Sequence, residues 1–216
     1  MPGIMLKNIS LTLIVLLQVA CVVEVNSGNH GHDISKVFGG VEVGDGQKMG
    51  DVDSVNGGIA LRDNSSADKV ETVNGSIRIH DDVSVYSVET VNGSIRAGRN
   101  LRVQQDVGTV NGSIDLQKST VIGDSVSTVN GSIHLEMTEV QRDIETVNGD
   151  IRLSDGSVVL GDVIFHENGW HSSRETNLPR LVVDANSAIK GTVHLYRKVR
   201  LEIDENADVG EIVEHF

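Results

Sequence analysis

The sequence predicts an all-β fold, a single-stranded parallel β-helix (β-solenoid) with about 18–19 residues per turn. The phrase Val-Asn-Gly-Ser-Ile returns along the chain, and the Asn residues of its six exact or near copies lie 18, 18, 19, 19 and 18 residues apart. Aromatic residues make up 3% of the chain and there are 2 Pro, a composition typical of short strands joined by tight turns. A period this short leaves no room for helical crossovers, so we expect each repeat to form one coil that pairs with the next.

The N-terminus is predicted to be an export signal that covers residues 1–27. Lys7 precedes an apolar run over residues 11–23, which is short for a membrane span. Two cleavage sites fit: a cut after Ser27 releases a soluble protein, whereas a cut before Cys21 resembles lipoprotein processing and makes Cys21 a lipid anchor. Cys21 is the only cysteine, so no intrachain disulfide forms. We expect the protein in the periplasm or cell envelope, with outer-membrane anchoring or secretion as alternatives.

Residues 28–35 are predicted to be a polar tether, and residues 36–216 the solenoid. Within each repeat, apolar residues recur three and five positions after the Asn and four positions before it, which indicates strands with one buried face. Asn-Gly is a strong turn signal, so we expect the chain to turn there with the Asn packed inside. A right-handed coil is favoured, because the clean six-residue pattern of left-handed helices is broken. The stacked amides are expected to form a ladder of Asn56, Asn74, Asn92, Asn111, Asn130 and Asn148.

The ends of the array and one interruption carry separate predictions. Phe38 takes the Asn position in a degenerate first unit, where it is expected to cover the open end of the core. Residues 213–216 are expected to cap the other end. An irregular loop at 166–179 breaks the pattern and carries Trp170, the sole tryptophan. Because long irregular loops often carry function, Trp170 is a candidate binding residue.

The export signal, the Thr-Val-Asn-Gly-Ser-Ile units and the closing pattern between Ser187 and Gly210 resemble a bacterial adhesin-like, β-strand-repeat family of unknown function. The resemblance covers about residues 36–213. It implies a β-helix in the bacterial envelope and brings no catalytic residues with it. The leading hypothesis is therefore a non-enzymatic scaffold or binding surface whose partner is an unidentified envelope protein or glycan.

Charge limits the partners. The net charge of −13 argues against nucleic acid and against anionic membranes, apart from a lipid on Cys21. We expect no cofactor and no metal. Exposed strand edges at the solenoid ends make end-to-end self-association a further expectation.

Two other function classes have residues to support them. For a polysaccharide-active enzyme, the column after the buried Ile reads Ala60, Arg78, Arg96, Asp115, His134 and Arg152, of which Asp115, His134 and Arg152 are the candidate cluster. A neighbouring acidic column contains Asp53, Glu71 and Glu89, is interrupted by Gly108 and Ser127, and resumes at Glu145. For ice or ordered-surface binding, a straight strand would expose a hydroxyl array of Ser54, Thr72, Thr90, Thr109, Thr128 and Thr146.

Overall fold

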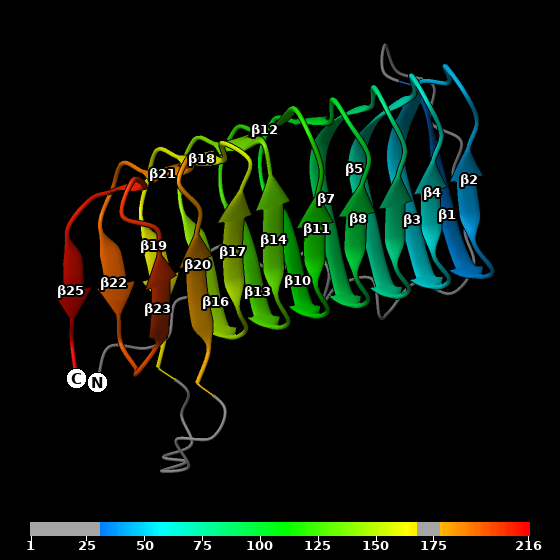
Figure 1. Cartoon of the computed structure of the whole chain (residues 1–216). Coiled ribbons are helices and arrows are strands. Elements are labelled where there is room, and N and C mark those ends of the chain that lie inside the picture. The colour runs from blue at the N-terminus through cyan, green and yellow to red at the C-terminus, as the bar shows by residue number, and fades with distance from the viewer. Residues whose placement is uncertain (1–30, 168–177) are drawn as a thin grey trace.

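The protein is a β-solenoid in a computed structural model that describes residues 31–167 and 178–216. All strand pairs in the described residues are parallel, and they form two sheets. Sheet B has nine strands, one from each coil, so the solenoid has nine coils (Figure 1). These strands are β2 (Val41–Val43), β4 (Ile59–Leu61), β6 (Ile77–Ile79), β8 (Ile95–Ala97), β11 (Ile114–Leu116), β14 (Ile133–Glu136), β17 (Ile151–Ser154), β20 (Arg180–Val183) and β23 (Arg200–Ile203).

Sheet A begins with four long strands and then divides into two arms. The long strands are β1 (His32–Phe38), β3 (Met49–Asn56), β5 (Ser66–Asn74) and β7 (Ser84–Asn92). One arm contains β9 (Arg102–Val103), β12 (Thr120–Ile122), β15 (Thr138–Val140), β18 (Val158–Val159), β21 (Ala188–Ile189) and β24 (Asp208–Val209). The other contains β10 (Val107–Asn111), β13 (Val126–Asn130), β16 (Ile144–Asn148), β19 (Val163–Phe165), β22 (Val193–Leu195) and β25 (Ile212–Glu214).

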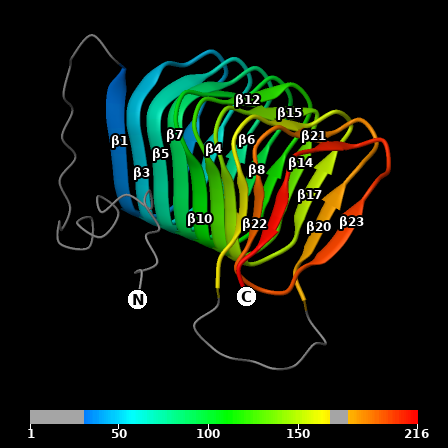
Figure 2. The same cartoon turned by 90° about the vertical axis from the view of Figure 1, so that its left-hand side faces the viewer.

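The coil is right-handed, as favoured from the sequence. In Figure 1 the strands of sheet B run upward at the front, the chain passes over the top, and the strands of sheet A run downward behind. The coils advance from right to left in that view, and Figure 2 shows the same rotation from the C-terminal end.

A single extra residue divides sheet A. In β7, Val85 pairs with Val103 and Val88 pairs with Val107. Two residues separate Val85 from Val88, but three separate Val103 from Val107. The added residue turns a continuous strand into two strands joined at a corner, which accounts for the 19-residue interval between the Asn residues there. Later coils consequently have three faces.

The predicted apolar columns form the core. The column three residues after Asn, which includes Ile77 and Ile95, is almost completely buried along the array, and so is the column four residues before Asn. The threonine column is also inside. Thr72 is completely buried, and its hydroxyl donates to the carbonyl oxygen of Gly57 in the preceding coil at 2.8 Å.

The Asn ladder forms, but the expectation that it lies inside is wrong. Each Nδ2 donates to Oδ1 of the Asn one coil earlier, at 3.1, 3.0, 2.9, 2.9 and 3.0 Å from Asn74 to Asn148. The side chains are exposed, because Val70 and Thr72 occupy the inner face and the turn leaves Asn74 at an outer corner. Arg197 donates to Oδ1 of Asn148 at 2.7 Å and closes the ladder.

The predicted caps are wrong at both ends. Phe38 is 79% exposed, because it lies in register with Asn56 and this column faces outward. At the other end Phe216 is 60% exposed, and the last coil leaves Leu201 and Ile212 each 38% exposed. The C-terminal tail therefore does not cover the core.

The boundaries of the array differ slightly from those predicted. Strand β1 begins at His32, so residues 32–35 of the predicted tether belong to the solenoid. Strand β19 ends at Phe165 and β20 begins at Arg180, which are the two sides of the predicted 166–179 loop. The predicted export signal, Cys21 and Trp170 lie outside the described residues. Within the described residues there is no helix of the length and apolarity needed to cross a membrane.

The glycine column gives the first prediction. A Cβ atom at Gly93 would overlap the carbonyl oxygen of Gly75, although φ at Gly93 is not positive. We expect Gly93→Ala to lower the free energy of unfolding by about 3 kcal/mol, because the coils must separate to admit the methyl group. Gly108→Ala is the matched control, since its Cβ would lie 3.4 Å from Ser127 Oγ, an ordinary contact. In urea titrations the control is expected to stay within about 1 kcal/mol of the wild type; equal losses in both variants would contradict the close-approach explanation.

The ladder gives the second prediction. Asn111→Ala removes one donated and one accepted hydrogen bond, to Asn92 and from Asn130. We expect a loss of about 1–2 kcal/mol in the free energy of unfolding. Asn56→Ala, at the first rung, removes only the bond from Asn74 and should cost about half as much. Thermal or chemical unfolding measures both losses. A larger loss of stability for Asn56→Ala than for Asn111→Ala would argue against the ladder as a stabilising element.

Candidate functional site

Charge is distributed unequally between the two sheets. The described strands of sheet A carry ten acidic and three basic residues, whereas those of sheet B carry four acidic and five basic ones. The net charge of the chain is −13, so sheet B is the face on which cationic groups gather. A strongly acidic sheet A and a nearly neutral, arginine-bearing sheet B favour different partners.

Outward side chains of sheet B stack in columns along the solenoid axis. The column that follows the buried Ile is here named the outer column. Strand register joins its members in an unbroken series: Glu42, Ala60, Arg78, Arg96, Asp115, His134, Arg152, Val182 and Glu202. A ligand lying along the solenoid axis would meet these residues one after another.

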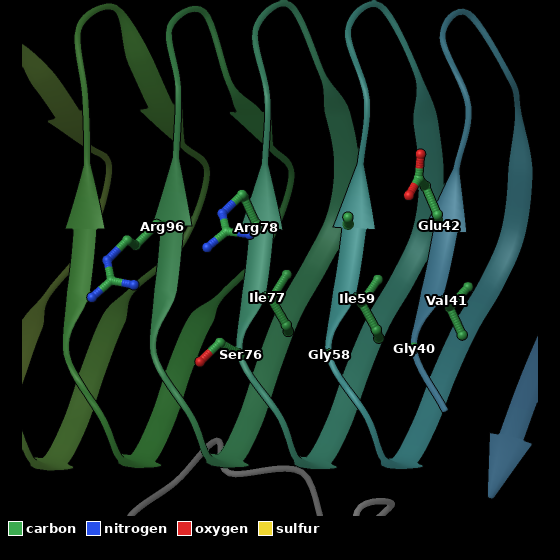
Figure 3. Close-up of a pocket in the computed structure, with 10 residues that line it drawn as sticks. Gly40, Val41, Glu42, Gly58, Ile59, Ser76, Ile77, Arg78 and Arg96 are labelled. Atoms are coloured by element: carbon green, nitrogen blue, oxygen red, sulfur yellow. The ribbon is translucent and has the colours of Figure 1, made fainter. Parts of the chain in front are cut away.

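The first coils of this face are hollowed into a groove of about 400 Å³. Its floor is open because Gly40, Gly58 and Ala60 project little or nothing from the strands. Glu42 stands at one end, and Arg78 and Arg96 stand at the other (Figure 3).

The charged groups around the groove differ in how they are neutralised. Glu42 accepts a hydrogen bond from Arg62 at 2.9 Å, and this bond lowers the pKa of the Glu42 carboxyl. Arg78 and Arg96 are exposed register partners on β6 and β8, and neither forms an ion pair within the part of the chain that the structure describes. The groove thus has an acidic end neutralised by Arg62 and a cationic end without an ion pair, where Asp115 is the register neighbour of Arg96 on the side away from the groove.

The predicted cluster of Asp115, His134 and Arg152 comes together in register on three neighbouring strands. The nearest atoms of the first two, His134 Nδ1 and Asp115 Oδ1, are 4.0 Å apart, which is too long for a hydrogen bond. Their side chains are 45% and 43% exposed. The geometry is that of an open surface column, without the enclosed, hydrogen-bonded arrangement that activates a catalytic group.

A second arginine cluster lies near the C-terminal end of sheet B and was missed from the sequence. Arg180, Arg197 and Arg200 line a hollow of about 540 Å³ that also contains Asp150. Arg180 pairs with Asp150 at 2.8 Å, whereas burial lowers the pKa of Arg197, which caps the ladder. Arg180 and Arg200 are register partners in β20 and β23. The repeat spacing could not predict this pairing, because the phrase has ended before these strands.

The threonine column excludes the predicted hydroxyl surface. Thr90, Thr109 and Thr128 are 1–2% exposed, and their hydroxyls donate to glycine carbonyls of the preceding coil at 2.9–3.1 Å. The expectation of an exposed array for ice or ordered-surface binding is therefore wrong. In these coils the inward hydroxyls satisfy backbone carbonyls at the corner, and buried hydroxyls offer nothing to an external lattice.

The acidic column of sheet A is present in register, from Asp53 through Glu71 to Glu89. Burial raises the pKa of Asp53 and Glu71, and neighbouring carboxylates add to the effect. No group of three or more His, Cys, Asp or Glu residues among those described is arranged to hold a metal ion. Because burial and mutual repulsion disfavour the ionised carboxylates, this column should destabilise the fold at high pH, and protonation at lower pH should remove that cost.

A pH-dependent stability follows from Glu71. Its folded-state pKa lies above the ordinary value of 4.5, so the unfolded chain loses the proton more readily and ionisation opposes folding. This cost is fully present above the folded-state pKa and disappears as the pH falls below the unfolded-state pKa. We expect Glu71→Gln to raise the unfolding temperature at pH 8, with a gain that vanishes near pH 4. Glu205→Gln, at an exposed position, is the control and should show no such pH-dependent gain.

Comparisons with known proteins add no further assignment: scans against protein-family models, curated proteins and solved structures found no match.

Proposed function

We propose that the protein is a non-enzymatic, adhesin-like β-solenoid scaffold of the bacterial envelope, and that the outer face of sheet B binds an envelope glycan or protein. The observation that carries this proposal is the gathering of arginine side chains on that face of a chain with a net charge of −13. The export signal and the resemblance of the repeat phrase to an adhesin-like family support the location.

The form of the solenoid suits a binding surface. Every strand of sheet B is fixed on both edges by the neighbouring coils, except at the two ends, so the outer column is held on a rigid support. A preorganised surface binds with little loss of conformational entropy. The buried columns account for the core, which leaves the outward positions free to vary in chemistry.

Binding by sheet B can be tested with three substitutions on its outer face. Arg78→Gln, Arg96→Gln and Arg152→Gln together remove three exposed cationic groups without touching the core. We expect the purified wild type to be retained on bacterial envelope glycan preparations, and the triple variant to bind about tenfold more weakly.

The control is Arg102→Gln, which removes one exposed arginine from sheet A and should leave retention unchanged. If the wild type is not retained on neutral or acidic envelope glycans or on envelope proteins, the proposed function is wrong. Equal retention of the wild type and the triple variant would show that sheet B is not the binding face.

A further inference from the structure

We propose that the groove over β2, β4, β6 and β8 binds the carboxylate groups of an acidic polysaccharide, with Arg78 and Arg96 as the residues that hold them. This inference rests on the proposed function, because it names the ligand class for the same face. Four observations lead to it: the unpaired arginines, the adjacent hydroxyl, the small floor residues and the direction of the groove.

The two guanidinium groups repel each other electrostatically in the unliganded protein. Arg78 and Arg96 lie directly opposite each other in adjacent strands, about 4.8 Å apart along the axis. Like charges in this arrangement repel. Asp115, the other register partner of Arg96, offsets part of this repulsion without forming an ion pair, and no described carboxylate pairs with Arg78. By contrast, Arg62 and Arg180 each have a carboxylate at 2.9 and 2.8 Å. An anionic ligand would relieve the repulsion and gain two charge-assisted hydrogen-bonding partners.

A carboxylate fits this pair better than a more highly charged group. The planar guanidinium fork matches the two oxygens of a carboxylate. The chain as a whole repels polyanions through its net charge of −13, and this repulsion grows with the charge density of the ligand. An acidic sugar, with one carboxylate on each ring, gives local pairing with less of that penalty than a nucleic acid gives.

The rest of the groove matches a sugar ring. Ser76 Oγ accepts the backbone N–H of Ser94 at 3.2 Å, so its own hydroxyl hydrogen is available to donate. Ala60 supplies a methyl group on a floor that is otherwise largely glycine backbone, and the C–H face of a ring can lie against this methyl group. A floor without projecting side chains, flanked by a hydroxyl and guanidinium groups, leaves room for a ring and supplies partners for its polar groups.

The direction of the groove indicates an extended ligand. It crosses four neighbouring strands, so its length along the solenoid axis is about 14 Å, three strand spacings. A polysaccharide segment of a few units fits this length. Glu42 at the first coil would repel a carboxylate, so the acidic groups should lie over Arg78 and Arg96 (Figure 3).

The test compares an oligogalacturonate with its fully methyl-esterified form, which has the same rings without the charge. We expect the wild type to bind the free acid about tenfold more tightly than the ester, and to lose this preference as the salt concentration rises. The double variant Arg78→Gln/Arg96→Gln should abolish the preference, whereas Arg102→Gln on sheet A should keep it.

A second variant keeps both arginines in place. Ala60→Glu puts a carboxylate in register with Arg78, where it occupies the site from within the chain. We expect Ala60→Glu to weaken binding of the free acid about tenfold, and the neutral Ala60→Gln, of equal size, to weaken it far less. Isothermal titration calorimetry measures both, and circular dichroism checks the fold.

The outcomes separate this inference from the proposed function. Equal binding of acid and ester, or equal effects of Ala60→Glu and Ala60→Gln, overturns the carboxylate site. If sheet B variants still lose retention on envelope glycans in that case, the proposed function stands and only the ligand class is wrong. If the wild type binds neither the oligogalacturonate nor any envelope preparation, both are wrong.

Discussion

The close stacking of one Asn-Gly corner on the next is the constraint on which the rest of the structure depends. At this corner the backbones approach so nearly that a Cβ on Gly75, Gly93 or Gly112 would overlap the glycine carbonyl of the preceding coil. The buried threonine hydroxyl donates to that same carbonyl, as Thr109 does to Gly93 at 2.9 Å. Outside the corner, the asparagine amides form a continuous ladder. At each corner, therefore, glycine permits the close backbone approach, threonine forms the hydrogen bond on the inside and asparagine forms the one on the outside.

This junction separates the demands on the inner and outer faces of the coil. Inside, aliphatic columns must repeat because each fills the space left by the coil before it. Outside, side chains are free to change from coil to coil, as the outer column does from Glu42 to Arg78 and then to Asp115. The resulting asymmetry, with an acidic sheet A and an arginine-bearing sheet B, is a property of the variable positions. Any recognition by this protein is accordingly expected where the repeat departs from uniformity.

Several particular residues show where reading the sequence succeeded and where it did not. The column containing Arg78, Arg96 and Asp115 was predicted in the correct order, because a fixed period sets the register of parallel strands directly. The groove beside Arg78 was not predicted, since it depends on small residues of two earlier coils lying side by side. Phe38 was predicted from its size to cover the open end of the core, although its register partner Asn56 faces solvent.

The sequence by itself determined the solenoid, the length of its coil, the register of its columns and the asparagine ladder, because repetition at 18–19 residues leaves one way to stack identical columns. Only the tertiary structure decided which side of the corner faces inward. Side chains alternate between the two faces of the strand both before and after Asn-Gly, and the turn between them can exchange the inner and outer faces. The spacing alone therefore does not show whether Thr72 or Val73 faces inward. Burial of Thr72 and exposure of Asn74 follow from the path of the backbone through that turn, which is fixed by contact with the neighbouring coils.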